Sequence, residues 1–539
     1  MRWRSHRRSG RCSTISRSGQ PPGECDAVTS YLLRPLDRLS VRYPDARLTG
    51  TIAAVTITLA SFGGGAIRYR GGVLDTLGLS FLSYGHGAAI SNVAMWLGLA
   101  LMTLAWVILG RGVLSGQVTD RAVTRSLIWW VAPLLLAAPI LSRDVYSYLM
   151  QGAMVRDGFD PYSQGAAVNP GPMLLEVSHD WRNTTTPYGP LHLWLGDGVT
   201  TIAGDSVTAG VFLYKLISLV GFWGIVWCVP RITARINGDA AVALWLGVAN
   251  PVTVLHLVGG MHNESVMVAL VSLGILLALD GRFTAAIALV AVSVAFKATG
   301  IIALPFLAWM MHRHLREKGL PLGSVGAFIA AGFWSVVTTL AVVSVCTWLS
   351  GAGWGWIAEL SGNSKVINPL AIPSLVAGIL TPLLEMTGAE VSYNAVLALM
   401  RQIGMVGMLV GLVIAWWVFR GDDRRNIMGI AAAYTVVVTL NAVTLPWYYV
   451  SLVVLLGTFD PSRRIVGLTA WCSVVVAMSF TGSGNHQMYN LVWMGVLALV
   501  AWHLTQWLMA GDDAVPVPAV DTTDADADAV RVPRPARGA

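Results

Sequence analysis

Charged residues are scarce in this sequence. Asp, Glu, Lys and Arg make up 12% of its 539 residues, whereas a soluble globular domain carries about 25%. Hydrophobic residues make up 55%, and the mean hydropathy is +0.62. The apolar runs extend over about 17 to 25 residues, as membrane helices require, and lack the period-two alternation of barrel strands. The composition therefore excludes a soluble domain and predicts an all-α integral membrane protein with about 13 to 15 transmembrane helices.

The sequence also lacks the patterns of metal, disulfide and nucleic-acid sites. Its five cysteines show no CxxC or other paired spacing, which argues against a metal cluster and a disulfide framework. The net charge is +7, but the basic residues lie in a tail and in short connectors, where they set membrane topology rather than bind nucleic acid. We therefore expect no cofactor, no metal and no nucleic-acid partner. No internal repeat is visible, which argues against a transporter built from inverted repeats.

The distribution of charge divides the chain into three regions. Residues 1–48 carry ten arginines against four acidic residues and form a predicted cytoplasmic tail. The first apolar run begins only near Gly50, too far into the chain for a cleaved signal peptide. Residues 49–510 form the predicted membrane domain. Residues 511–539 are of low complexity and are predicted to be a disordered cytoplasmic tail.

Two long polar segments interrupt the membrane domain, at residues 142–190 and 350–394. Arg111, Arg121 and Arg125 lie in the connector before the third predicted span, so the positive-inside rule places that connector in the cytoplasm and the first segment outside. Counting the later spans brings the second segment to the same outer face. Because loops on a rigid scaffold carry much of the chemistry of proteins, these segments are where a site is expected.

The segment 142–190 holds the candidate catalytic carboxylates. Asp144 directly follows a predicted span, where a carboxylate on a helix end is well placed to take a proton from a sugar hydroxyl held at the membrane surface. The alternative is that Asp144 caps the next helix or pairs with Arg143. Asp160 is followed by a proline, and Asp-Pro commonly begins a turn. Tyr188 precedes Gly-Pro and indicates the end of the loop, where the chain returns to the membrane.

A second polar cluster lies between two later spans. His262, Asn263 and Glu264 stand at a predicted turn, and ionisable groups close to the hydrocarbon are candidates for function by default. Their spacing lacks the HExxH pattern of a zinc site. Hydrogen bonding to a polar ligand is therefore the favoured interpretation.

Isolated cations and aromatic residues supply further candidates. Lys297 is the only charge in its long apolar run, and it either snorkels to the interface or holds an anionic phosphate at the outer leaflet. Arg182, in the first polar segment, is a second candidate for that phosphate. Trp447 and Tyr448 either belong to an aromatic belt or stack on the face of a sugar.

Four short motifs occur in order along the chain: SRDVYSY at 142–148, DGFDPY at 157–162, WRNTTTPYGPL at 181–191 and GGMHNESVM at 259–267. In this order and at these separations they resemble the polyprenyl-phosphomannose-dependent α-(1→6)-mannosyltransferases of mycobacteria and corynebacteria. Within that family the resemblance is closest to the B-type enzyme, and it extends from about Gly63 to Asn490. The ordered set is specific, whereas DPY or HNE alone is a weak signal.

The resemblance implies a C-type glycosyltransferase fold in the plasma membrane, with the active site facing outward. It implies a donor, mannose β-linked to polyprenyl phosphate, and a mannosylated glycolipid acceptor in the α-(1→6)-mannan core of lipomannan and lipoarabinomannan. In that class an acidic residue early in the first large outer loop is the base, and Asp144 occupies the matching position. Lys297 or Arg182 would stabilise the leaving phosphate. The expected substrate-binding set is Arg143, Tyr146, Asp160, Tyr188, His262, Asn263, Glu264, Trp447 and Tyr448.

Two other classes of function share this composition. A transporter or flippase of a lipid-linked sugar has the same apolar bulk and midchain polar residues, and the long outer loop with its carboxylates argues against it. A noncatalytic assembly subunit of cell-wall synthesis would tolerate the loss of Asp144. Product formation by detergent-solubilised protein, with no membrane gradient, distinguishes the enzyme from the transporter.

Overall fold

The computed structural model describes residues 45–319, 321, 323–360 and 366–510. The regular elements in these ranges are all helices, apart from one isolated bridge between Phe480 and His486. The all-α prediction is therefore confirmed for this part of the chain. The predicted tail 511–539 lies outside it, as does the predicted tail 1–48 except for residues 45–48, which begin the first described helix.

Six of these helices are long and apolar enough to cross a membrane: α2 Ala46–Gly64, α4 Gly85–Leu114, α9 Val207–Arg235, α15 Gly323–Ser350, α18 Tyr393–Val418 and α22 Leu491–Met509. A seventh crossing results if Ala240–Val248 and Pro251–Gly259, bent by 51°, form one broken span. These helices agree with a multi-pass membrane protein. The expected number of 13 to 15 spans stays a prediction, because length alone does not decide whether the shorter apolar helices cross the membrane. The C-type fold also stays a prediction.

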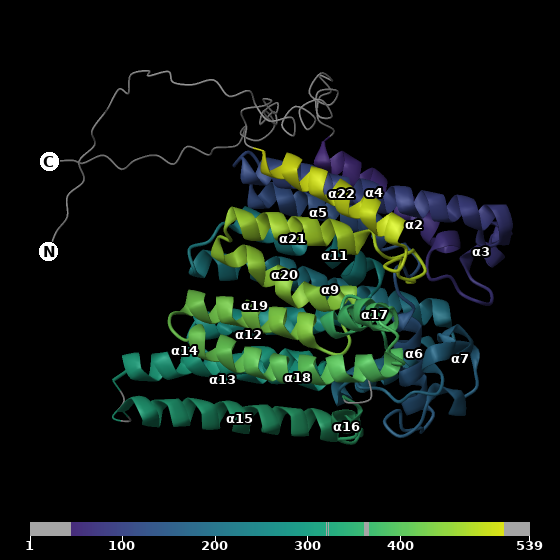
Figure 1. Cartoon of the computed structure of the whole chain (residues 1–539). Helices are drawn as coiled ribbons and strands as arrows, with labels where there is room; N and C mark the ends of the chain where they lie inside the picture. The colour runs from purple at the N-terminus through teal and green to yellow at the C-terminus, as the bar shows by residue number, and fades with distance from the viewer. Residues whose placement is uncertain (1–44, 320, 322, 361–365, 511–539) are drawn as a thin grey trace, which may run out of the picture. The chain divides into compact units, whose positions relative to one another are not determined.

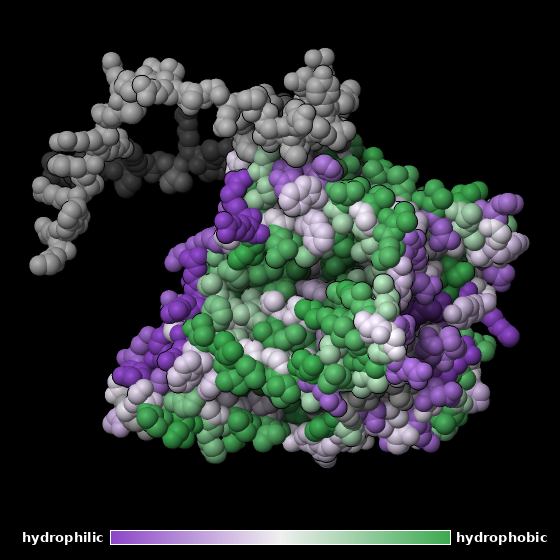
Figure 2. Space-filling model, viewed as in Figure 1, coloured by the Kyte–Doolittle hydropathy of each residue, from purple (hydrophilic) through white to green (hydrophobic). Residues whose placement is uncertain are grey.

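The remaining longer helices are α5 Asp120–Leu134, α6 Asp144–Arg156, α8 Pro190–Ala203, α12 Glu264–Leu279, α13 Phe283–Phe296, α14 Leu304–Glu317, α17 Ile372–Glu385, α19 Asp423–Leu440 and α21 Arg463–Ala477. Shorter pieces are α3 Val73–Thr76, α7 Pro172–Glu176, α10 Ala240–Ala243, α11 Pro251–Thr253, α16 Trp356–Glu359 and α20 Val450–Leu456. In Figure 1 the long helices run side by side, with α6 and α7 at their right-hand ends. Figure 2 shows hydrophobic residues between polar left and right edges, as expected for a membrane-crossing bundle.

Two helix breaks place polar residues inside the bundle. α13 ends at Phe296 and a 3-10 turn begins at Ala298, so the long apolar run that contains Lys297 is broken at this residue. The second break is at Asn250, between Ala240–Val248 and Pro251–Gly259, and the Asn250 side chain caps the following helix by accepting the Val252 N–H at 3.0 Å. Breaks of this kind are tolerated in a membrane only where protein surrounds the freed backbone groups.

The polar segment 142–190 contains a packed helix rather than irregular loop alone. Eight of the thirteen residues of α6 are buried, and α6 packs closely on α8. The approach is closest at Gly152 and Gly196, where an added side chain on Gly152 would overlap the Gly196 carbonyl. This packing holds the helix that begins at Asp144 rigidly against the bundle.

Candidate active site

Two bulky residues with left-handed backbones precede the polar cluster. Leu141 has a φ of 62° and Met261 a φ of 55°, a conformation that costs about 1–3 kcal/mol and is concentrated at functional sites. The Leu141 N–H donates to the Gly482 carbonyl at 2.7 Å. This tertiary contact therefore fixes the backbone three residues before Asp144.

Asp144 is the first residue of α6, and its backbone N–H donates to Ser142 Oγ at 3.0 Å. Its Oδ2 lies 3.5 Å from His262 Nδ1, and 22% of its side chain is exposed. Burial raises the pKa of the Asp144 carboxyl from 3.8 to about 6. A carboxylate with a pKa near 6 is a stronger base than a surface aspartate and is still ionised at neutral pH.

His262 is completely covered by its neighbours. Its ring stacks on Trp447, with centroids 3.5 Å apart and planes 16° apart, and its side chain is 0% exposed. Burial holds the pKa of His262 well below its ordinary value, so the imidazole is neutral. The structure therefore places His262 behind Asp144, and it occupies one face of the Trp447 ring that was expected to stack on a sugar.

Lys297 is held in a buried ion pair with Glu264. Its Nζ also donates to Asn263 Oδ1 at 3.1 Å. The rings of Tyr448 and Tyr188 lie with their centroids 4.6 and 5.6 Å from the ammonium group, within range for cation–π attraction. The Glu264 carboxylate offsets the buried positive charge of Lys297. Because Tyr188 and Tyr448 also line a cavity beside Asp144, the ion pair lies directly behind the wall of that cavity.

The end of the polar segment is attached to this cluster through its backbone. The Gly189 N–H donates to the Phe296 carbonyl at 3.3 Å, which brings Tyr188 next to Lys297. The Tyr162 hydroxyl donates to the Tyr188 carbonyl at 3.0 Å. Asp160 in turn accepts the Tyr162 N–H at 2.9 Å. The DPY motif therefore forms the turn predicted for Asp160, and this turn supports Tyr188.

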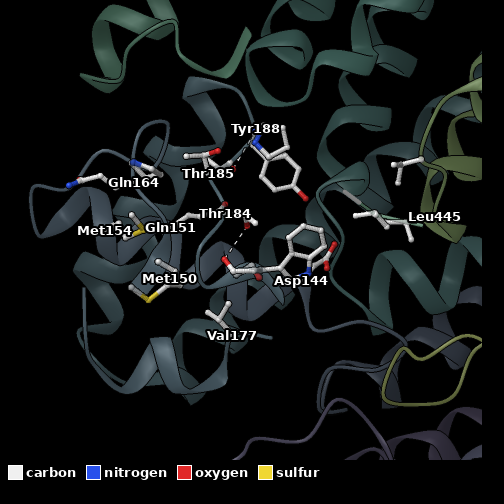
Figure 3. Close-up of a pocket in the computed structure, with 18 of the residues that line it drawn as sticks. Asp144, Met150, Gln151, Met154, Gln164, Val177, Thr184, Thr185, Tyr188 and Leu445 are labelled. Carbon is white, nitrogen blue, oxygen red and sulfur yellow. Dashed lines mark hydrogen bonds between the residues drawn. The ribbon is translucent and has the colours of Figure 1, made fainter. Parts of the chain in front are cut away.

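A cavity of about 80 Å³ opens beside Asp144. Figure 3 shows Gln151 and Gln164 to the left of Asp144, Leu445 to its right and Tyr188 above it. Three predicted residues line the cavity: Asp144, Tyr188 and Tyr448. The polar lining residues that the sequence analysis missed are Ser147, Gln151, Gln164, Thr184, Thr185 and Thr186. Helical spacing places Ser147 and Gln151 on the same face as Asp144, and this spacing has no meaning in the irregular loop that was predicted for 142–190.

Arg143 and Tyr146 point away from this cavity. The Arg143 guanidinium donates to the Glu176 carbonyl at 2.7 Å and lies 3.5 Å from the Glu176 carboxylate. The Tyr146 hydroxyl donates to the Ala66 carbonyl at 2.8 Å, and its ring lines a separate cavity of about 380 Å³. The alternative in which Asp144 pairs with Arg143 is therefore wrong, because Arg143 contacts Glu176 instead.

Arg182 also differs from its expected place. Its guanidinium donates to the carbonyls of Val177 and Leu175, each at 3.2 Å, and Arg182 is not among the residues that line the cavity beside Asp144. These bonds fix the fold of the segment around α7. The structure thus groups Lys297, but not Arg182, with the tyrosines behind Asp144.

Comparisons with known proteins agree with the ordered motifs. A family model described as "Alpha-(1->6)-mannopyranosyltransferase, N-terminal domain" matches residues 47–313, and one described as "MptB C-terminal domain" matches residues 371–510. A protein of Corynebacterium glutamicum named alpha-(1->6)-mannopyranosyltransferase A is 55% identical, covering 83% of this chain and 95% of that protein. Its namesake in Mycobacterium tuberculosis is 39% identical, covering 89% and 93%.

The expectation of closest resemblance to the B-type enzyme is wrong. The Corynebacterium glutamicum protein named alpha-(1->6)-mannopyranosyltransferase B is 28% identical, covering 78% of this chain and 73% of that protein. Both relatives named A are more similar to the chain.

Proposed function

This chain belongs to the family of alpha-(1->6)-mannopyranosyltransferases, and on that premise we propose that it is an inverting, polyprenyl-phosphomannose-dependent mannosyltransferase. The acceptor is the 6-hydroxyl of a mannose in the α-(1→6)-mannan core of lipomannan and lipoarabinomannan, carried on a glycolipid. The reaction takes place at the outer face of the plasma membrane. The observation that carries this proposal is Asp144, a carboxylate with a pKa of about 6 on the wall of a cavity that both polar and apolar side chains line.

The proposed reaction is a single displacement. The acceptor O6 attacks the anomeric carbon of the donor while Asp144 accepts the O6 proton. The bond from the anomeric carbon to the phosphate oxygen breaks, and the electron pair leaves with the polyprenyl phosphate. A β-linked donor therefore gives an α-linked product, and no covalent sugar intermediate is needed.

His262 acts on this step through Asp144. Its stacking on Trp447 fixes the imidazole, and its Nδ1 lies 3.5 Å from the Asp144 carboxylate. Because the neutral imidazole carries one N–H, it stabilises the ionised carboxylate when that N–H lies on Nδ1. We therefore assign His262 and Trp447 as positioning residues, in place of their expected role in sugar binding.

We assign the leaving phosphate to Lys297. The phosphate would approach the ammonium group between Tyr188 and Tyr448, whose rings flank it. The side-chain oxygen of Asn263 and the Glu264 carboxylate hold the ammonium group in place when no phosphate is bound. Arg182 is left out of this role, because backbone carbonyls hold its guanidinium.

The test is transfer of labelled mannose from polyprenyl-phosphomannose to an α-(1→6)-dimannoside by purified full-length protein in detergent. We expect an α-(1→6)-linked trimannoside from the wild type and at least a hundredfold loss in Asp144→Asn. Asp160→Asn is the matched control and should keep its activity, because asparagine also caps a turn. Substantial activity in Asp144→Asn removes Asp144 from the role of base.

Two further arms test the rest of the proposal. Transfer in detergent excludes the transporter and the noncatalytic subunit, since neither forms a glycosidic bond. We expect EDTA to leave the rate unchanged, because a phosphate leaving group beside a lysine needs no further cation. Loss of activity with EDTA that a divalent cation restores would overturn metal independence.

A further inference from the structure

Helix α6 forms one wall of the cavity, and beside Asp144, Met150 and Met154 this wall carries two polar side chains that the transfer step does not use. Asp144, Ser147 and Gln151 follow one another at spacings of three and four residues, which places them on one face of the helix. All three line the same cavity, and Figure 3 shows Gln151 on its left-hand side. Gln151 lies about 10 Å along the helix axis from Asp144.

Two atoms on this wall are buried without a partner. Ser147 Oγ and Gln151 Oε1 make no hydrogen bond to any part of the chain that the structure describes. A buried polar atom in this state costs about 1–3 kcal/mol. A ligand that brings hydroxyl groups to the wall removes that cost.

The opposite side of the cavity differs in chemistry. Val443 and Leu445 line it with apolar surface, and Tyr448 leads from it to Lys297. A lipid-linked phosphate fits this side, whereas the ring of hydroxyl groups on a free sugar end fits the α6 side. The cavity of about 80 Å³ holds roughly five to eight waters, which is the scale of one sugar ring.

We propose that Ser147 and Gln151 form the acceptor subsite, where they hydrogen-bond to the non-reacting hydroxyl groups of the mannose whose 6-hydroxyl meets Asp144. This inference rests on the proposed function and adds which residues select the acceptor. Gln151 Oε1 accepts from a sugar hydroxyl, and Ser147 Oγ both accepts and donates. The two residues hold the ring so that only one of its hydroxyl groups reaches the carboxylate.

The experiment measures acceptor and donor KM separately in Gln151→Leu and Ser147→Ala, with an α-(1→6)-dimannoside and polyprenyl-phosphomannose as the substrates. We expect the acceptor KM to rise about threefold to tenfold in each variant, as for the loss of one hydrogen bond, with the donor KM unchanged. Gln117→Leu is the matched control, because Gln117 is exposed in the connector between α4 and α5. Its constants should equal those of the wild type.

Acceptors that lack single hydroxyl groups provide an independent arm in the unaltered protein. One deoxy acceptor should raise the wild-type KM by the same factor as Gln151→Leu, and the two changes combined should give no further rise. Because the deoxy acceptors are measured with the unaltered protein, they test the subsite even if a variant fails to fold. The subsite is overturned if both variants have the same acceptor KM as the wild type. It is also overturned if no deoxy acceptor changes the KM of the wild-type protein. An inactive wild type overturns the proposed function instead.

Discussion

Replacing Asp144 with asparagine should make the protein more stable while it removes activity. Burial raises the pKa of the Asp144 carboxyl from 3.8 to about 6, so the folded state holds this charge at a cost of about 3 kcal/mol at neutral pH. Because 22% of the side chain is exposed, part of the charge is solvated and the expected gain for Asp144→Asn is about 2 kcal/mol.

The sign of the effect depends on pH. Above pH 6 the carboxyl is ionised in both the folded and the unfolded chain, and the full cost is present. Between pH 6 and 4 the folded protein binds the proton first, so the wild type gains stability as the pH falls. The advantage of Asp144→Asn should therefore be largest at pH 7.5 and should shrink at pH 5.

Thermal unfolding in detergent, followed by the fluorescence of the 22 tryptophans, measures this difference. We expect a rise of a few degrees in Tm at pH 7.5 and a smaller rise at pH 5. Asp180→Asn is the control, because its side chain is 67% exposed and its loss should change Tm little. A lower Tm for Asp144→Asn at pH 7.5, or a difference that does not change with pH, would refute the reasoning.

Three further predictions concern the same region. The kcat/KM should rise about tenfold from pH 5 to 7, as the base with a pKa of about 6 loses its proton, and a flat profile would exclude this base. Glu264→Gln should lower the free energy of unfolding by about 3–5 kcal/mol, because it leaves the Lys297 charge unpaired. Adding Lys297→Met to this variant should restore most of the lost Tm. Gly152→Ala should lower the free energy of unfolding by about 1–3 kcal/mol, because the added methyl group forces α6 away from α8. Gly198→Ala should leave stability unchanged, because its methyl group meets open space.

Much of the site's location was readable from the linear order of polar residues. Asp144, Tyr188 and Lys297 are each set in or beside apolar runs, where a polar side chain has few structural reasons to occur. These predictions concern where the chain leaves the hydrocarbon, which depends on composition over short windows.

The roles of neighbouring residues could not be read in this way. Arg143 is adjacent to Asp144 in sequence but turns to Glu176, and His262 was expected to face substrate but is covered by Trp447. The direction of each side chain depends on which helix packs beside it. That information lies in contacts between residues that are not neighbours in the sequence: Glu176 lies 33 positions beyond Arg143, and Trp447 comes from a much later helix than His262.

The sequence by itself determined a helical membrane protein, the polar segment from 142 to 190 and the family to which the chain belongs. Hydrophobic runs and ordered motifs are local properties, so they needed no knowledge of packing. Only the tertiary structure decided that this segment contains α6, that Ser147 and Gln151 share a face with Asp144, and that Lys297 is paired with Glu264. Burial and ion pairing decide which charged groups are neutralised by a neighbour and which polar atoms remain free to bind a ligand. Burial and ion pairing arise only when separate segments of the chain pack together.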